Sequence, residues 1–168
     1  MRCRKRGLSL SYPSGSARQM KILVVDGAGG SIGQQIISKI RESLPSKTEI
    51  LALGTNAIAA SNMMKAGANL GASGENAFRV TVPEADIITG PVSIMIPNSF
   101  MGELTPAMAE YLSLSKAKKV LLPLGKHIEL VGTSNLPLPH LMDEAIRLIK
   151  AAISEIKSKQ AAEVKENV

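Results

Sequence analysis

Three glycines at three-residue spacing, Gly27, Gly30 and Gly33, follow the apolar run "KILVV" within "DGAGGSIG". Between a strand and a helix, such glycines permit a tight turn and let backbone N–H groups approach phosphate oxygens. The N-terminus of the helix adds a partial positive charge. The spacing predicts a phosphate loop of the dinucleotide-binding kind. Its candidate residues are Asp26, Gly27, Gly29, Gly30, Ser31, Ile32 and Gly33.

The same glycines also fit a tight turn that binds nothing. The loop is not a P-loop, because no Gly-Lys-Ser or Gly-Lys-Thr follows it. Dinucleotide sites place an acid for the ribose hydroxyls at the end of the second strand, and here that place reads Gly54-Thr55-Asn56. Asn56 could bind a ribose and Thr55 a phosphate. Asp26 either serves a ligand or accepts N–H groups of its own turn.

A substitution at Gly30 should separate the two interpretations where its φ is negative. In a simple turn, Gly30→Ala should change the free energy of unfolding by no more than about 1 kcal/mol. In a phosphate loop, the added methyl group should weaken ligand binding at least about tenfold.

Other polar residues follow the predicted strands, where ligands bind in open α/β sheets. Lys126 and His127 are the candidates for catalysis, because histidine titrates near neutral pH. Neither has an identifiable partner in the sequence, so enzymatic activity stays open. Glu103 could face the ligand or serve as a favourable charge near the start of a helix. The further candidates are Thr55, Asn56, Thr89, Asn98 and Ser99, and Asn98 and Ser99 join the cofactor-binding set.

Apolar runs alternate with helical periods along the chain, which is typical of βαβ units. We expect an α/β fold, a Rossmann-like three-layer sandwich with a mostly parallel sheet of four to six strands. Residues 20–157 form its single domain, and residues 158–168 are expected to fray. The predicted strands are 21–25, 49–53, 78–82, 85–90 and 119–125, and the predicted helices are 32–44, 58–65, one from Pro106 and one with the apolar stripe Leu141, Ala145, Leu148, Ala152 and Ile156. Residues 67–77 read as a loop, and residues 92–96 as either a strand or a buried turn.

The composition bounds the class of partner. The formal net charge is +6, but residues 1–19 carry five Arg and Lys residues and no acid, so the rest of the chain has only +1. With 2% aromatic residues as well, we expect no nucleic-acid binding. Residues 1–19 are predicted to be a disordered basic tail, with translation starting at Met20.

Lys116, Lys118 and Lys119 suit the C-terminus of the preceding helix, because their positive charges lie near its partial negative charge.

No apolar run reaches the length of a membrane span, so we expect a cytoplasmic protein without a membrane partner. The single cysteine, Cys3, allows no disulfide framework. Zinc and serine-hydrolase motifs are absent, so no metal site is predicted. An apolar patch that favours a homodimer is expected from Met63, Met64, Met95, Phe100 and Met101.

Four segments carry a resemblance to a known family: "MKILVVDGAGGSIG", "ALGTNAIAASNMMKAGANLGASGENA", "GPVSIMIPNSFMGELTPAMAE" and "AKKVLLPLGKHIELVG". Together they resemble a small bacterial family catalogued as domain of unknown function 3842, over about residues 20–146. The resemblance implies a Rossmann-like fold and a chain beginning at Met20, and it implies no activity.

The loop alone also resembles that of short-chain dehydrogenases. Those enzymes place a catalytic tyrosine four residues before a lysine. Here Tyr111 is followed at that distance by Ser115, and Lys116 comes one position late, so dehydrogenase activity is not expected. The predicted function is binding of a nucleotide, NAD(P) among the possibilities, or another phosphorylated metabolite. The alternatives are a small enzyme acting on such a ligand and a structural or scaffolding subunit.

Overall fold

The computed structural model describes residues 19–125, 128–131, 133 and 136–166. Residues 1–18 of the predicted basic tail (1–19) and the two catalytic candidates, Lys126 and His127, lie outside this part of the chain. The strands are β1 (Lys21–Asp26), β2 (Glu49–Gly54), β3 (Leu70–Ser73), β4 (Ile87–Pro91) and β5 (Lys118–Leu122). The helices are α1 (Ser31–Ser43), α2 (Ala57–Lys65), α3 (Glu75–Thr81), α4 (Pro106–Leu114) and α5 (Leu138–Glu166), with 3-10 turns η1 (Val82–Glu84) and η2 (Val92–Met95).

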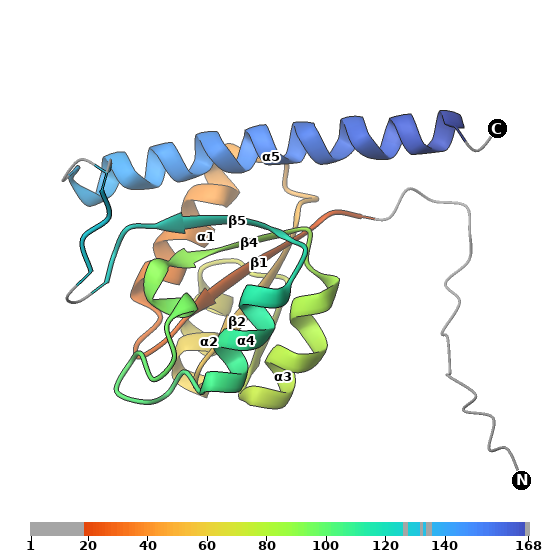
Figure 1. Ribbon diagram of the computed structural model, residues 1–168. Coiled ribbons are helices and arrows are strands. Elements are labelled where there is room, and N and C mark those ends of the chain that lie inside the picture. Colours follow the sequence, from red (N-terminus) through yellow and green to blue (C-terminus); the bar gives the residue numbers. More distant parts are fainter. Residues whose placement is uncertain (1–18, 126–127, 132, 134–135, 167–168) are drawn as a thin grey trace, which may run out of the picture.

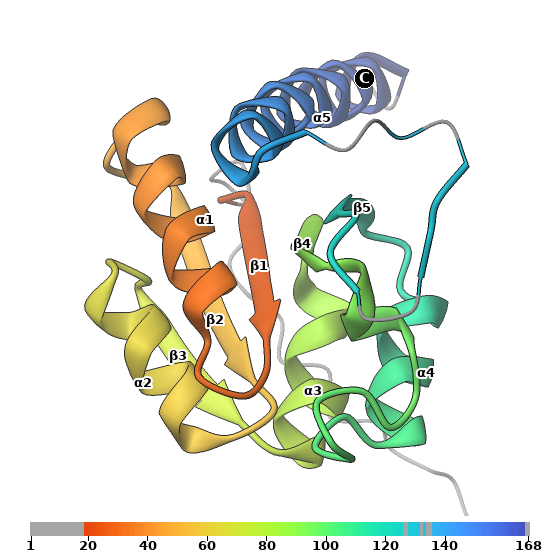
Figure 2. The ribbon, with the colours of Figure 1, turned by 90° about the vertical axis from the view of Figure 1, so that its left-hand side faces the viewer.

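The five strands form one parallel sheet in the order β3-β2-β1-β4-β5. This confirms the predicted α/β class and the parallel sheet. The chain builds outward from β1 through β2 to β3, and then returns to β4 on the other side of β1 (Figures 1 and 2). The segments that follow β1 and β4 therefore leave the sheet toward opposite faces. This reversal is the place where open α/β sheets bind ligands.

Helices cover both faces of the sheet. The core on one face contains buried residues of α1, α2 and α5, and the core on the other face contains those of α3, η2 and α4. Alternate residues of β1 supply the two cores, Ile22 and Val24 to the first and Leu23 and Val25 to the second. The result is the three-layer arrangement of Figure 2, in which α1 and α2 lie across the sheet from α3 and α4.

Several helix ends follow from local sequence. α1 ends at Ser43, because the residue before Pro45 is disfavoured in a helical conformation and Leu44 is extended. α4 begins as predicted, since the Thr105 hydroxyl accepts the N–H of Met108 at 3.2 Å. α2 is followed by Gly67 with a φ of +109°, the left-handed conformation that glycine provides after a helix.

Two assignments between residues 67 and 84 are wrong. β3 lies within the predicted loop. It pairs with β2 alone, all four of its residues are exposed, and three of them are small, so it gives little hydrophobic signal. Residues 78–82 belong to α3 and η1 rather than to a strand. Phe78 and Val82, four residues apart, both enter the same core, and this spacing suits a helical turn better than a strand.

The segment left open between Pro91 and Pro97 is a turn. η2 covers its first half, and Ile94 is the residue that it buries. Of the five residues expected in an apolar patch, Met64 and Met101 are exposed, whereas Met63 is fully buried. Met95 and Phe100 are half-buried against the second core. The expected patch is therefore not formed as a unit.

α5 is longer than expected and runs past the edge of the sheet (Figure 1). Fraying was expected for residues 158–168; of these, residues 158–166 belong to α5. They are rich in strong helix formers, and an ion pair of 2.8 Å joins Lys159 to Glu155 one turn earlier. Its buried stripe is Met142, Ala145, Ile146, Ile149 and Ala152, while Leu148 is 41% exposed. Across the described residues, no helix combines the length and the hydropathy that crossing a membrane requires.

Thr89 lies in the middle of β4 and does not reach the carboxyl edge, contrary to its candidacy as a ligand residue. It is fully buried, and its hydroxyl has no hydrogen-bond partner in the described structure. Thr89→Val should therefore leave the free energy of unfolding unchanged or raise it by about 1–3 kcal/mol, measured by urea denaturation. As a control, Thr105→Val removes a helix cap and should cost about 1 kcal/mol. A loss of that size at Thr89 would show that its hydroxyl is bonded.

Candidate functional site

Asp26 lies at the carboxyl end of β1 and holds the glycine loop from beneath. Its side chain is buried, and its two oxygens accept the N–H groups of Gly27 at 2.8 Å and Gly33 at 2.7 Å. Gly33 lies in the first turn of α1, whose N-cap residue, Gly30, makes no side-chain cap. The carboxylate thus caps α1 from a distance, and its charge lies at the positive end of the helix.

Two effects act in opposite directions on the Asp26 carboxyl. Burial is the larger effect and raises the pKa of Asp26 above its ordinary value, while the N–H groups of Gly33, Gly27 and Ile32 partly offset the rise. Both oxygens accept hydrogen bonds from N–H donors, which is the arrangement of an ionised carboxylate. Asp26 therefore serves its own glycine turn, one of the two roles considered for it, and at 2% exposure it does not face a ligand.

Packing explains two of the loop glycines. A Cβ at Gly27 would lie 2.5 Å from the Phe100 ring, and a Cβ at Gly33 would overlap the Met63 side chain. The lack of a side chain at Gly27 lets Phe100, from the segment after β4, pack against the loop, and the lack of one at Gly33 lets α1 approach α2. Neither glycine requires a ligand for its presence.

Gly30 and Gly29 differ sharply. Gly30 has a φ of +70°, and a Cβ there would lie 2.8 Å from the Cα of Ala59 in α2. Gly30→Ala is therefore strained in any case, so the experiment expected from the sequence does not distinguish a turn from a phosphate loop. At Gly29 the backbone is not left-handed, and nothing lies within 4 Å of the Cβ position. Gly29 is thus the loop glycine whose surroundings leave room above the backbone.

Glu103 reaches the loop from the segment between β4 and α4. Its Oε2 accepts the N–H of Ala28 at 2.9 Å, the hydroxyl of Thr55 at 2.6 Å and the side-chain amide of Asn56 at 2.8 Å. The Thr55 hydrogen bond is the main reason that the pKa of Glu103 is lowered. The carboxylate therefore joins the ends of β1 and β2, and it is ionised at neutral pH.

Asn56 and Asn62 connect the loop to α2. The Asn56 amide donates to the carbonyl of Ala28 at 2.9 Å, while its Oδ1 accepts the N–H of Ala59 at 2.8 Å and caps α2. Asn62 donates to the carbonyl of Gly29 at 3.0 Å. These bonds fix the loop backbone from the side of α2. Neither Ala28 nor Asn62 carries a sequence pattern that marks it.

An unusual turn delivers Glu103 to this place. Asn98, Phe100, Met101 and Gly102 all have φ between +57° and +91°. The N–H of Asn98 donates to the carbonyl of Leu104 at 2.8 Å, and the N–H of Leu104 donates to the carbonyl of Ser99 at 3.2 Å. Left-handed conformations at non-glycine residues are uncommon and cost free energy, so the surrounding contacts must hold them.

The predicted site residues thus separate into groups. The structure brings the glycine loop together with Thr55, Asn56 and Glu103. Asn98 and Ser99 act through backbone bonds of the turn that carries Glu103; Asn98 is exposed and Ser99 is half-buried. Ser31 is exposed at the start of α1, and Ile32 is half-buried beside it.

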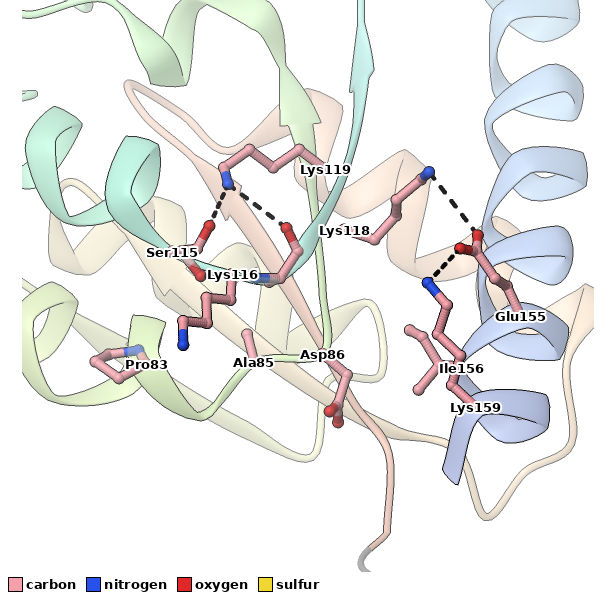
Figure 3. Close-up of a pocket in the computed structure, with 11 residues that line it drawn as sticks. Pro83, Ala85, Asp86, Ser115, Lys116, Lys118, Lys119, Glu155, Ile156 and Lys159 are labelled. Carbon is pink, nitrogen blue, oxygen red and sulfur yellow. Dashed lines mark hydrogen bonds and ion pairs between the residues drawn. The ribbon is translucent and has the colours of Figure 1, made fainter. Parts of the chain in front are cut away.

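A cavity of about 620 Å³ lies at the opposite, amino-terminal edge of the sheet (Figure 3). Three of the four lysines that line it have partners: Lys119 donates to the carbonyl of Ser115 at 2.6 Å, and Lys118 and Lys159 lie 3.9 and 2.8 Å from Glu155. For Lys119, this confirms the expected interaction near the C-terminus of α4. A second groove of about 600 Å³ begins at Ser31 and follows α1 toward Pro139 and Met142 of α5.

No group of three or more His, Cys, Asp or Glu residues suited to a metal ion occurs in the described part of the chain. A comparison with family models matches residues 21–154 to the family described as "Domain of unknown function (DUF3842)". The chain belongs to this family. The resemblance seen in the sequence is thereby confirmed. Comparisons of this DUF3842 chain with curated proteins and with solved structures found no match.

The role of Asp26 can be tested by an isosteric change. In Asp26→Asn, one carboxylate oxygen becomes an NH2 group that faces the N–H of Gly27 or Gly33, so a buried donor loses its acceptor. We expect the free energy of unfolding to fall by about 1–3 kcal/mol in chemical denaturation. The control is Asp143→Asn, which alters an exposed ion pair with Lys39 and should cost at most about 1 kcal/mol. Equal stability of Asp26→Asn and the parent would contradict the capping role.

Proposed function

We propose that this protein binds a nucleotide or another phosphorylated metabolite at the loop between β1 and α1. The observation that carries the proposal is Gly29. Gly27, Gly30 and Gly33 each have a packing reason to lack a side chain, but Gly29 faces open space. A glycine at an exposed position is useful where another molecule must approach the backbone closely.

The free donors of the loop support the same proposal. Asp26 and Glu103 take the N–H groups of Gly27, Gly33 and Ala28. Among the described residues, no acceptor is found for the N–H groups of Gly29 and Ser31. Both residues are exposed, and Ser31 is the first residue of α1. Two such donors on exposed residues at the positive end of a helix suit phosphate oxygens.

The location in the sheet adds a topological argument. β1 lies between β2 and β4, and the chain reverses its direction of travel across the sheet at β1 and β4. Ligands of open α/β sheets bind outside the carboxyl ends of the strands at this reversal. The proposal is limited to binding, because the catalytic candidates Lys126 and His127 lie outside the described residues.

Gly29→Ala tests the proposal directly. The parent is first screened by thermal shift with NAD, NADP, ATP, coenzyme A and sugar nucleotides; a ligand at 100 times its Kd should add about 2.7 kcal/mol of stability. Because the new methyl group stands where the phosphate would lie, Gly29→Ala should bind the active ligand at least about tenfold more weakly. Its stability without ligand should change by no more than about 1 kcal/mol.

Gly30→Ala is the matched control. It adds the same methyl group one residue away, but against the backbone of Ala59 and at a positive φ. It should therefore lose stability by more than Gly29→Ala does. A parent that responds to none of the ligands would favour the scaffolding alternative. A Gly29→Ala variant that binds as tightly as the parent would remove the loop from the binding site.

A further inference from the structure

The carboxylate of Glu103 lies at the carboxyl end of β2, where the local sequence contains no acidic residue. The residues that end β2 are Gly54, Thr55 and Asn56, where dinucleotide-binding folds carry a carboxylate for the ribose hydroxyls. In this structure, Thr55 and Asn56 are instead the donors that hold the carboxylate of Glu103 at 2.6 and 2.8 Å. An acid from 48 residues further along the chain thus reaches the end of β2.

The two carboxylate oxygens of Glu103 have different surroundings. Oε2 accepts all three hydrogen bonds, from Thr55, Asn56 and the N–H of Ala28. For Oε1, no donor is found among the described residues, and the side chain is half-buried. A carboxylate oxygen accepts hydrogen bonds readily, so Oε1 is an oriented acceptor beside the loop.

The carboxylate is held rather than loosely placed. The left-handed turn at residues 98–102 fixes the backbone that precedes it. On the other side, Leu104 is fully buried in the core with α4. The Phe100 ring also packs where Gly27 lacks a side chain. These contacts hold the backbone on both sides of Glu103.

We propose that Glu103 Oε1 accepts hydrogen bonds from the ribose hydroxyls of a nucleoside diphosphate whose phosphates bind at Gly29 and Ser31. This inference rests on the proposed function and narrows it to one ligand class. Its negative charge selects an unmodified ribose and repels one that carries a 2′-phosphate. The ligand class is a nucleoside diphosphate, or a larger molecule containing one, with a free 2′-hydroxyl.

Glu103→Gln tests the role with little change in shape. The amide oxygen of glutamine can accept the bonds from Ala28, Thr55 and Asn56, which leaves an NH2 group in place of Oε1. That NH2 group donates but cannot accept, so the ribose hydroxyl loses its partner. The control is Glu75→Gln, because Glu75 is an exposed carboxylate that accepts from the Thr105 hydroxyl at 2.6 Å.

The measurement is calorimetric titration of the full chain with ADP, GDP and UDP, each beside its 2′-deoxy counterpart. The parent should bind at least one diphosphate, and bind it at least about tenfold more tightly than the deoxy form. In Glu103→Gln this ratio should fall to about threefold or less, while Glu75→Gln keeps the ratio of the parent. Adenosine 2′,5′-bisphosphate should bind Glu103→Gln more tightly than it binds the parent, a gain that simple loss of structure would not produce.

The outcomes distinguish the ribose-binding role of Glu103 from phosphate binding at the loop. If ribose and deoxyribose forms bind the parent equally, or if Glu103→Gln keeps the preference of the parent, the role of Glu103 is overturned and phosphate binding at the loop still stands. If the parent binds none of the diphosphates, the assignment of Glu103 and this ligand class are both overturned. Should Glu103→Gln not fold, the comparison of the ribose and deoxyribose forms on the parent still decides the inference.

Discussion

The buried carboxylate of Asp26 is the interaction on which the rest of the site depends. It ends β1, accepts N–H groups from both ends of the loop, and so fixes where α1 begins. A carboxylate removed from water is unfavourable unless hydrogen bonds compensate it. Here the backbone donors and the positive end of α1 supply that compensation. The loop is therefore already shaped in the free protein.

The consequences spread outward from that bond. Asp26 holds the loop at Gly27 and Gly33. Between them, Gly30 packs against Ala59 of α2, and the N–H of Ala28 donates to Glu103. No acceptor is found among the described residues for the N–H groups of Gly29 and Ser31, and both residues are exposed. The carboxylate of Asp26 thus holds the loop at Gly27 and Gly33, and that of Glu103 holds it at Ala28. The two carboxylates take different donors, so their effects on the loop do not compete.

The parts of this arrangement that depend on local sequence were predictable. Strand β1, the glycine turn and α1 follow from an apolar run, glycine spacing and the pattern of Ile36, Ile37 and Ile40. The cap at Thr105 and the left-handed Gly67 follow from short-range residue preferences. β3 could not be predicted, because a short, exposed edge strand with a single large apolar residue, Leu70, has no hydrophobic pattern.

Glu103 was a candidate, but its contact with the loop was not predictable. Ala28 and Glu103 are 75 residues apart, and the turn before Glu103 requires positive φ at Asn98, Phe100 and Met101. Asparagine favours that conformation, but no residue preference indicates it at Phe100 and Met101. Likewise, only the close approach of α2 shows that Gly30, rather than Gly29, is required by packing. Tertiary contacts determine both the position of Glu103 and the packing of Gly30, and the spacing of residues in the sequence does not reveal these contacts.

The most direct measurement of the central claim, that a diphosphate binds at the outward donors of the loop, is an amide NMR titration of the protein with ADP. The account predicts that the backbone signals of Gly29 and Ser31 and the side-chain amide signals of Asn56 shift most. The signals of Gly27 and Gly33, which Asp26 already holds, should shift less. Signal shifts confined to the cavity lined by Lys116 and Lys118, or no residue-specific shift at saturating ADP, would contradict it.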